Sequence, residues 1–435
     1  MYCVDPPANI AKRILALGER RRLTPLTAVI TAPTLRLDGT VLDAPGYDAS
    51  TGLYLYAPAG TLSCKIVEMP SVEDCRRALD DLWCPFEKFP FVDTLDRGVM
   101  LAALLTATVR AILPTAPGFG FDAPVQGSGK SLLASCVAAL AGEVAPSVYP
   151  HTLDEAEIRK RLLTVLRSGA AAVVWDNVLG EFDSAALAAL LTSDRYTDRI
   201  LGVSQSTTLP NRVLLAITGN NLILKGDMTR RVLVARIDPA TDTPHAREFD
   251  FDPLTQIREH RFDLAAAAIT LMRGFLASGA QPARGRMASF EAWNDLVRNT
   301  VAWVGQEVAA DRFGDPMAAV KRALENDPEL DALSALLAAL EENFENSSFR
   351  TQEVMERIIK FKDPATRRSS VSDCPKFRLY EALITLNERA VNTTASLGKT
   401  LKYRKDRMID GRVLRQSQDR HRKTSVWRVA EVEAD

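Results

Sequence analysis

The spacing of apolar and polar positions divides the chain into four sections. In residues 1–92, short β-branched runs alternate with the turn signals DG, PG and TG, most regularly over 26–58, which predicts antiparallel strands. A helix is predicted over 71–83, where Ser71 can act as the N-cap and Asp74 stands at the third helical position. This section is therefore expected to be a small α+β domain that serves as a collar or a docking surface.

Residues 93–240 change to an alternation of helices and continuous apolar runs. Runs such as AAAVVWDN and RVLLAITGNN end in polar residues, as buried parallel strands often do. We therefore predict an α/β core with a mostly parallel sheet, whose ligand lies at the carboxyl ends of the strands. The expected elements are helices at 94–113 and 130–141 and strands at 170–177, 212–221 and 230–238.

The remaining sections, 241–345 and 346–435, are predicted to be helical and then mixed. Amphipathic stretches such as DLAAAAITLMRGFLA and DALSALLAALEENF indicate helices in the first of them. In the second, helices at 350–361, 377–390 and 396–408 precede two strands. A helix followed by a β-hairpin at the end of a helical module is typical of a winged-helix domain, which is the fold expected there.

The composition is that of a soluble globular protein of two or three domains, with 435 residues, 46% hydrophobic and 25% charged. The net charge of -1 conceals a basic segment, since residues 397–428 contain 11 Lys or Arg and 3 Asp or Glu. None of the six cysteines forms a C-x-x-C pair. The N-terminus lacks an apolar signal core, and the longest apolar segment, 99–113, is interrupted by Arg110. We expect a cytoplasmic protein with reduced thiols and no membrane contact.

Candidate chemistry begins at residues 121–140, FDAPVQGSGKSLLASCVAAL, which have the form of a phosphate-binding loop. In such a loop, backbone N–H groups converge on phosphates at the positive end of the following helix, and a lysine and a serine contact phosphate and Mg²⁺. Pro124 replaces the usual first glycine, where a fixed φ is tolerable; a Gly-Ser turn that carries a lysine is the alternative. The expected ATP-binding residues are Pro124, Gln126, Gly127, Ser128, Gly129, Lys130 and Ser131.

Polar residues further along supply the partners that such a loop needs. Asp176 ends a buried strand and is expected to hold Mg²⁺ together with Ser131, with a turn cap as the alternative. Asn220 ends the next apolar run, where its amide can orient an attacking water or simply form a turn. One of Arg230 and Arg231 is expected to reach a neighbouring subunit's nucleotide, unless both form surface ion pairs. The expected catalytic residues are Lys130, Asp176, Asn220, Arg230 and Arg231.

On the motifs APVQGSGKS, VVWDNV, ITGNN and GDMTRR, the chain resembles the AAA+ ATPases, and within them the superfamily 3 helicases, especially prophage and mobile-element primase-helicases. The resemblance implies a ring, expected to be a homo-hexamer, with ATP and Mg²⁺ between subunits and single-stranded DNA through the centre. The chain departs from the family in two ways: Asn177 stands where a second acid is usual, and no primase pattern precedes the loop. The candidates for the acid that polarises water are Glu157, Glu181 and Asp183.

Two basic regions are candidates for DNA binding. Superfamily 3 proteins carry a DNA-contacting hairpin between the two motifs VVWDNV and ITGNN; here it corresponds to a turn near 206–211, with Arg195, Arg199 and Arg212 around it. The alternatives are that these arginines contact nucleotide or a neighbouring subunit, or that the segment is a plain β-hairpin without DNA contact. At the C-terminus, a solvated face or a protein-docking surface is the alternative to DNA contact. The expected DNA-binding residues there are Lys399, Lys402, Arg404, Lys405, Arg407, Arg420, Arg422 and Lys423.

The sequence is therefore interpreted as a ring-forming, ATP-dependent DNA helicase for replication of a phage or mobile element, acting on single-stranded and forked DNA. A separate primase or replication protein is an expected partner. The alternative is a nucleotide-switched initiator that binds duplex DNA without unwinding it. A P-loop phosphotransferase is disfavoured because no lid and no acceptor-binding pair of acids is visible in the sequence.

Overall fold

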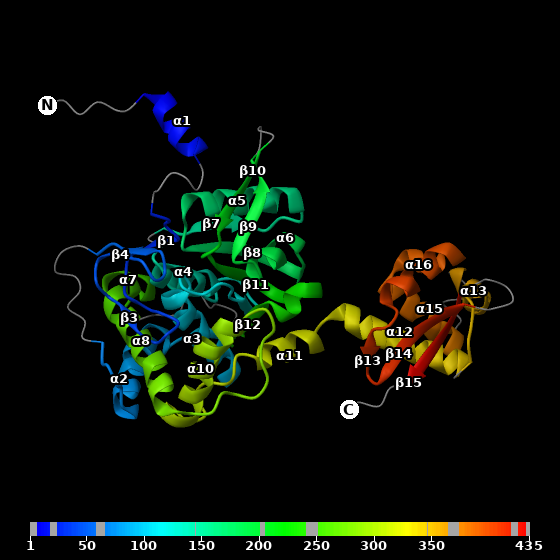
Figure 1. The fold of residues 1–435 in the computed structure, drawn as a ribbon. Helices are drawn as coiled ribbons and strands as arrows, with labels where there is room; N and C mark the ends of the chain where they lie inside the picture. Colours follow the sequence, from blue (N-terminus) through cyan, green and yellow to red (C-terminus); the bar gives the residue numbers. More distant parts are fainter. Residues whose placement is uncertain are drawn as a thin grey trace. The chain divides into compact units, whose positions relative to one another are not determined.

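A computed structural model describes most of the chain and divides it into two compact units (Figure 1). The first unit consists of the residues up to Gly180, Ser184–Leu222 and Arg231–Ala319, and the second of Glu181–Asp183, Ile223–Arg230 and the residues from Val320 onward. The described residues are 7–17, 24–57, 66–143, 145–200, 205–240, 251–345, 347–363, 374–418 and 425–431.

The centre of the first unit is a five-stranded sheet in the order β12-β6-β11-β8-β7. β6 pairs in parallel with both β11 and β12, and β7 pairs in parallel with β8. β8 and β11 also run in the same direction, because Leu214 N–H donates to Ala171 O and Lys225 N–H donates to Phe182 O. The predicted parallel α/β core is confirmed. The strands are β6 (Gly118–Ala123), β7 (Ser147–Pro150), β8 (Ala172–Phe182), β11 (Leu214–Leu224) and β12 (Val232–Arg236).

Helices enclose this sheet (Figure 1) because its central strands are apolar on both faces; every residue of β6 is buried. α3 packs against α4, α8 and β12, and α5 packs against α6. α3 begins with a capping box between Asp93 and Asp96, and α4 begins directly after the left-handed Gly129. The helices predicted at 94–113 and 130–141 are both present. The bounds are α3 Thr94–Val109, α4 Lys130–Ala141, α5 Glu155–Ser168, α6 Ala185–Leu191, α7 Pro253–Glu259 and α8 Arg261–Ser278.

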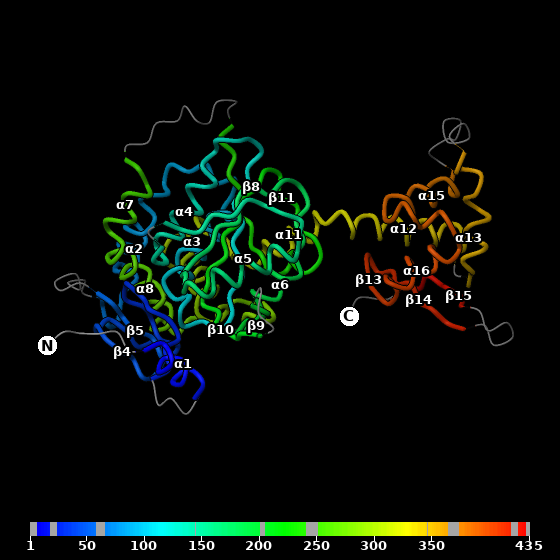
Figure 2. The backbone as a smooth tube through the Cα atoms, turned by 90° about the horizontal axis from the view of Figure 1, so that it is seen from above, coloured from blue at the N-terminus to red at the C-terminus, as the bar shows by residue number. Residues whose placement is uncertain are grey.

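The N-terminal section agrees only in part with the predicted antiparallel strands. β2 pairs with β3 and β4 with β5 in antiparallel fashion, but β1 pairs with β5 in parallel. The turn signals correctly mark the reversals between neighbouring strands. β1, however, pairs with β5, from which it is separated in sequence by β2, β3 and β4. Figure 2 shows β4 and β5 away from β8 and β11, and β2 packs against α3 and α8. The elements are α1 Ala8–Ala16, β1 Ala28–Ile30, β2 Thr34–Leu35, β3 Val41–Leu42, β4 Gly46–Asp48 and β5 Leu53–Leu55.

The helix predicted at 71–83 is α2 (Val72–Trp83), and its N-terminus has the capping box expected of Ser71 and Asp74. It packs against α8. The helical section of the first unit continues with α9 (Glu291–Trp293) and α10 (Asn299–Trp303), between which Asn294–Arg298 form a π-helical turn. No described helix is long and apolar enough to cross a lipid bilayer.

The second unit has its own hydrophobic core, formed by residues such as Leu336, Leu383 and Trp427. α12 packs against α15, so this helix, which the sequence placed in the 241–345 section, shares its core with the C-terminal helices. α16 and the hairpin β14–β15 follow in the predicted order. The bounds are α11 Ala318–Glu325, α12 Pro328–Phe344, α13 Thr351–Ile358, α15 Pro375–Leu386, α16 Thr394–Arg404, β13 Met408–Ile409, β14 Arg412–Gln418 and β15 Ser425–Glu431.

Candidate nucleotide-binding site

The loop between β6 and α4 has the backbone of a phosphate cradle. Gly127 and Gly129 have φ values of 75° and 100°, a left-handed region that costs other residues free energy. A Cβ on Gly129 would also lie 3.0 Å from the Phe89 ring. Glycine is therefore required at position 129 by both conformation and space. The loop lies at the carboxyl end of β6, between β12 and β11 in the sheet, and leads into the N-terminus of a helix, where phosphates bind favourably.

The lysine of this loop lies over its own backbone. Lys130 is buried, and its Nζ donates a 2.9 Å hydrogen bond to Val125 O, which also accepts one from Ser128 Oγ at 2.6 Å. Burial lowers the pKa of Lys130, and the nearby carboxylates of Asp122 and Asp176 act in the opposite direction. The side chain is thus a desolvated cation that an anionic ligand would further stabilise.

The serine of the loop and the predicted acid are in direct contact. Ser131 Oγ donates to Asp176 Oδ1 at 3.0 Å, although 45 positions separate the two residues. Thr218, on the neighbouring strand β11, donates to the same oxygen at 2.6 Å. A hydroxyl and a carboxylate side by side are the oxygen ligands that Mg²⁺ takes in nucleotide sites. The pairing of Ser131 with Asp176 that the sequence proposed is present in the structure.

Asn220 lies at the end of the β11–β6 pairing, opposite Ala123, the last residue of β6 before the loop. Its Oδ1 is buried and has no hydrogen-bond partner among the described residues. Because an unpaired buried polar atom costs free energy, this amide fits a site that receives a polar ligand or a water molecule. The residues present therefore fit a nucleotide with Mg²⁺.

The structure gives a backbone reason for Asn177 at the position of the second acid. Asn177 has a φ of 59°, a conformation that Asn tolerates better than most residues, and its N–H donates to Thr218 Oγ1 at 3.0 Å. Two of the three acids considered as its substitute are engaged elsewhere: Glu157 pairs with Arg161 at 3.0 Å, and Glu181 with Lys225 at 2.8 Å. The structure does not single out Glu157, Glu181 or Asp183 as the acid that polarises water.

The two arginines proposed to act across a subunit boundary have different surroundings. Arg230 is exposed and forms an ion pair with Asp227 on the same turn. Arg231 is half-buried and donates to Ala188 O at 2.6 Å. Pro124 and Gln126 of the loop are exposed. The roles predicted for these four residues stay predictions.

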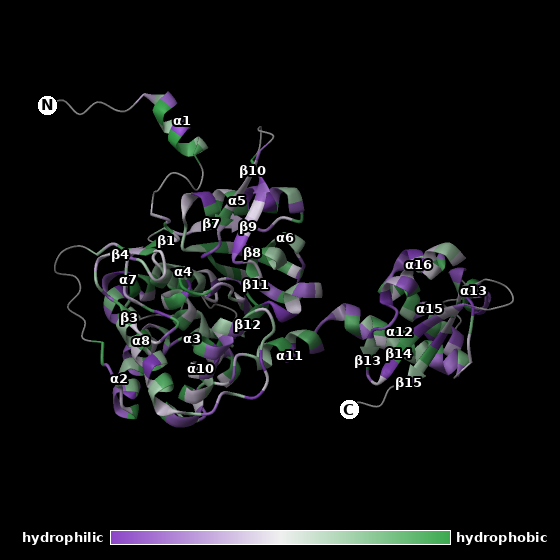
Figure 3. Ribbon diagram, viewed as in Figure 1, coloured by the Kyte–Doolittle hydropathy of each residue, from purple (hydrophilic) through white to green (hydrophobic). Residues whose placement is uncertain are grey.

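Between the two motif strands, β9 (Arg195–Arg199) and β10 (Ser206–Pro210) form an antiparallel hairpin. The turn predicted near 206–211 is wrong: residues 206–210 are the second strand, because the reversal comes earlier in the chain. β9 is largely hydrophilic (Figure 3), with Arg195 and Arg199 exposed. Arg212, in contrast, is mostly buried and paired with Asp194.

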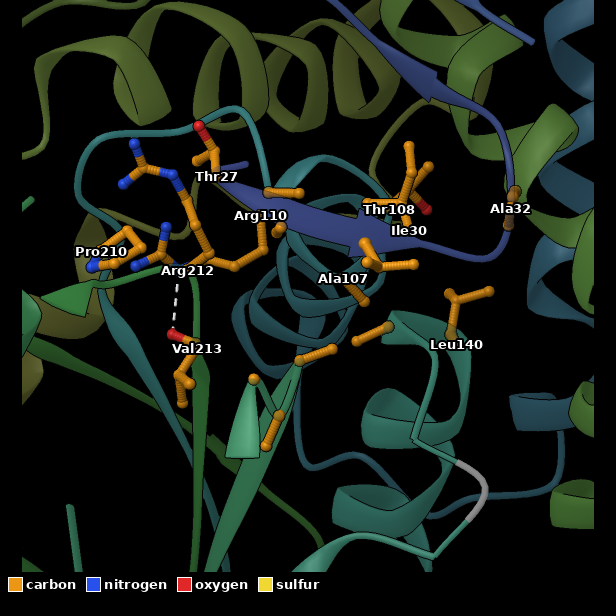
Figure 4. A pocket seen from close by; sticks show the side chains of 18 of the residues that line it. Thr27, Ile30, Ala32, Ala107, Thr108, Arg110, Leu140, Pro210, Arg212 and Val213 are labelled. Atoms are coloured by element: carbon orange, nitrogen blue, oxygen red, sulfur yellow. Dashed lines mark hydrogen bonds between the residues drawn. The ribbon is translucent and has the colours of Figure 1, made fainter. Parts of the chain in front are cut away.

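A buried arginine anchors the root of this hairpin, although in the sequence it is only a break in an apolar segment. Arg110 donates to Val213 O at 2.9 Å, Leu113 O at 2.7 Å and Asn211 O at 3.1 Å. Burial lowers its pKa to about 9. Figure 4 shows Arg110 and Arg212 in the wall of a cavity of about 330 Å³ at the amino end of the sheet, with the bond to Val213 dashed.

The basic residues of the C-terminal module are not equally available. The helix predicted over 396–408 is shorter in the structure: α16 ends at Arg404, so Lys405 and Arg407 lie beyond it. Arg404 and Arg407 both face Glu329, at 3.2 and 3.7 Å. Lys399 and Lys402 line an open groove with the N-terminus of α13 and residues of β14 and β15. Arg420, Arg422 and Lys423 lie outside the described residues.

The comparisons add little to this geometry. No protein-family model matches the chain, and no curated protein matches it significantly. The chain is similar to the NrS-1 C-terminal region (residues 305–718, apo), with a TM-score of 0.39 and 12% identity over 89% of this chain and 84% of that one. Two structures of JCV helicase, one with a bound compound, have TM-scores of 0.26 and 0.25 and 14% and 16% identity, over 58% of this chain and 66% of theirs.

Likenesses with such low scores carry no argument about substrate or assembly. The class of the protein follows instead from its own geometry: a five-stranded parallel sheet with a glycine-rich loop and a paired Ser131–Asp176 at its carboxyl end defines an α/β P-loop fold.

Proposed function

We propose that the protein is a ring-forming, ATP-dependent DNA helicase of the superfamily 3 type, acting in replication of a phage or mobile element. The observation that carries the proposal is the meeting of Ser131, Asp176 and Thr218 beside the loop that holds Lys130. Three separate segments of the chain contribute these groups: the loop with the start of α4, β8 and β11. A Gly-Ser turn without a ligand would not need the groups from β8 and β11. The same motifs underlie the resemblance to AAA+ proteins.

In this proposal, the loop 124–131 binds the triphosphate through its backbone and Lys130. Ser131 and Asp176 would hold Mg²⁺, which would supply positive charge against the phosphates. Thr218 keeps the Asp176 carboxylate in place. Asn220 uses its unpaired amide to orient a water molecule toward the γ-phosphate.

The proposed subunit arrangement is a homo-hexamer in which an arginine acts on the nucleotide of the neighbour. Arg230 is the better candidate on exposure, since its side chain is 64% exposed, whereas the Arg231 guanidinium is held by a carbonyl of α6. A mixing experiment tests the arrangement: subunits with Arg230→Ala are combined with Lys130→Ala subunits. Recovery of ATP hydrolysis at intermediate ratios is expected. The same mixture is made with Arg231→Ala, and a lack of recovery with both arginine variants would refute catalysis across a subunit boundary.

Two surfaces are proposed to contact DNA. The β9–β10 hairpin would contact the single strand through Arg195 and Arg199, and the C-terminal module, in the manner of a winged helix, would bind duplex through Lys399 and Lys402. The structure supports the choice of these four cations because each is exposed or lines an open groove. A primase or another replication protein is the proposed partner of this activity.

Unwinding of a forked duplex tests the function as a whole. Wild-type protein is expected to hydrolyse ATP faster with single-stranded DNA and to separate the fork. Lys130→Ala should abolish hydrolysis while duplex binding is retained; Lys321→Ala, which removes an exposed lysine paired with Glu325, is the matched control. Full turnover by Lys130→Ala would refute the site. DNA-stimulated hydrolysis without strand separation would favour the nucleotide-switched initiator.

A further inference from the structure

Asp122 is a buried acid that no part of the proposed function uses. It is the fifth residue of β6, directly before the last strand residue Ala123, and its side chain is only 6% exposed. A carboxylate taken out of water is costly unless it is paired and hydrogen-bonded. Its position two residues before the phosphate-binding loop therefore calls for a physical explanation.

The contacts of Asp122 lie at the end of the neighbouring strand. Pairing of β11 with β6 stops at Asn220 and Ala123, because β6 leaves the sheet there to form the loop. Leu222 lies in β11 beyond the end of this pairing, and its N–H donates instead to Asp122 Oδ1 at 2.9 Å. The side chain thus replaces a backbone acceptor that the sheet no longer provides.

Between the two residues, the backbone is held in an uncommon conformation. Asn221 has a φ of 51°, a left-handed state that an asparagine adopts only when its surroundings fix it. The hydrogen bond from Leu222 fixes the residue directly after this turn. Asn220, the residue directly before it, has the buried amide oxygen without a partner.

Charge explains how the acid is tolerated. Arg236 Nε, on β12, lies 3.5 Å from Asp122 Oδ2, and the negative charge also opposes the effect of burial on Lys130. Asp122 therefore links three strands of the sheet at the edge where the loop begins: its own β6, β11 through a backbone N–H, and β12 through an ion pair.

We propose that Asp122 is a positioning residue for Asn220: its carboxylate fixes the left-handed turn at Asn221 and so holds the Asn220 amide in the direction needed to orient the attacking water. This inference rests on the proposed role of Asn220 in ATP hydrolysis. It assigns to Asp122 an effect on turnover that is exerted through another residue, with no contact to nucleotide.

A double-mutant cycle in the full-length protein separates this role from a general structural one. Asp122→Ala is expected to lower kcat for ATP hydrolysis by about 10- to 100-fold, because small displacements of a positioning group have effects of that size. The affinity for a fluorescent ATP analogue should change by less than about threefold, a margin within the scatter expected of such measurements. In the Asn220→Ala background, Asp122→Ala should cause almost no further loss, since the residue through which it acts is gone.

Three variants serve as controls. Asp122→Asn keeps an oxygen that can accept the Leu222 N–H and should recover most of the kcat. Arg236→Ala removes the ion pair but not this hydrogen bond, and is expected to affect stability more than kcat. Asp96→Ala removes another fully buried acid that accepts a sheet N–H, from Arg236 at 2.8 Å, and its effect should multiply with that of Asn220→Ala.

The outcomes are distinguishable. If Asp122→Ala lowers kcat by the same factor in both backgrounds, the positioning role is refuted, and Asp122 is structural like Asp96. If Lys130→Ala retains turnover, the proposed function itself fails. If thermal unfolding shows that Asp122→Ala does not fold, Asp122→Ser replaces it in the double-mutant cycle. The serine side chain is polar but too short to accept the Leu222 N–H.

Discussion

Thr218 offers the sharpest single test of the candidate site, because one hydroxyl makes two contacts there. It is 2% exposed, donates to Asp176 Oδ1 at 2.6 Å and accepts the Asn177 N–H at 3.0 Å. Thr218→Val keeps the shape of the side chain and removes both hydrogen bonds. Any effect can therefore be attributed to the hydroxyl and not to a cavity.

The magnitude follows from the two lost contacts. A hydrogen bond to a charged group contributes about 1.5–3 kcal/mol to the free energy of unfolding. Asp176 is only half-buried and keeps the hydrogen bond from Ser131. The expected loss of stability therefore lies toward the low end of this range, at about 2 kcal/mol. For a large domain this corresponds to a fall in Tm of roughly 4–8 °C. Groups that orient a metal ligand typically change metal affinity by about 10- to 100-fold when removed. The Mg²⁺ concentration at half-maximal hydrolysis should rise correspondingly.

Differential scanning calorimetry and a Mg²⁺ titration of ATP hydrolysis measure the two effects. Thr218→Ser retains the hydroxyl and should resemble wild type in its Mg²⁺ requirement. Thr300→Val removes a fully buried hydroxyl that donates to Leu296 O, four residues earlier, at 2.6 Å, and should lower Tm without changing that requirement. An unchanged Mg²⁺ requirement in Thr218→Val would show that this hydroxyl does not orient the carboxylate, and the metal role of Asp176 would lose its support.

Other predictions follow from single residues. Gly129→Ala forces a left-handed alanine, at a cost of about 1–2 kcal/mol, against the Phe89 ring 3.0 Å from the new Cβ; titration with a fluorescent ATP analogue should show weakened binding, and wild-type affinity would contradict the cradle. Arg110→Met removes a donor from three carbonyls, of which Asn211 O keeps a 2.9 Å hydrogen bond from Arg212, and should lower the free energy of unfolding, measured by urea denaturation, by at least about 2 kcal/mol; a smaller loss would mean that water replaces the arginine. Lys399→Gln with Lys402→Gln should make the log–log salt dependence of duplex binding less steep by about 1.8 if each lysine contacts a phosphate, as anisotropy titrations at several salt concentrations would show; an unchanged slope would exclude both contacts.

The parts of the site that the sequence could predict are those that depend on local signals. The start of α4 at Lys130 follows from a glycine-rich turn before an apolar helix, and the neighbouring positions of Asp176 and Ser131 follow from the rule that parallel strands end at one edge. The capping box at Ser71 is likewise a local pattern. Each of these needs only a short window of residues or one general rule of sheet architecture.

The remaining contacts join side chains to the backbone of distant segments, and no periodic pattern records them. Asp122 and Leu222 are 100 positions apart, and Arg110 reaches carbonyls 101 and 103 positions away. In the sequence, Arg110 only interrupts an apolar segment, and no local pattern distinguishes Asp122 from its neighbours. The parallel pairing of β1 with β5 was missed for a similar reason, because turn signals describe only neighbouring strands.

The strands β8 and β11 share a backbone feature. It explains why the sequence ends both strands too early, at 177 and 221, and it bears on the presence of Asn177 in place of a second acid. Asn177 and Asn221 each adopt a left-handed conformation directly after a site residue, Asp176 in β8 and Asn220 in β11, and each strand then continues, to Phe182 and Leu224. The polar residues that mark the strand ends in the sequence are therefore turns within longer strands. Because a left-handed position favours asparagine or aspartate over glutamate, the backbone disfavours glutamate at position 177. Conformation therefore explains why the longer acid is not found there, and under the proposed function the acid that polarises water is sought on another segment of the chain or on a neighbouring subunit.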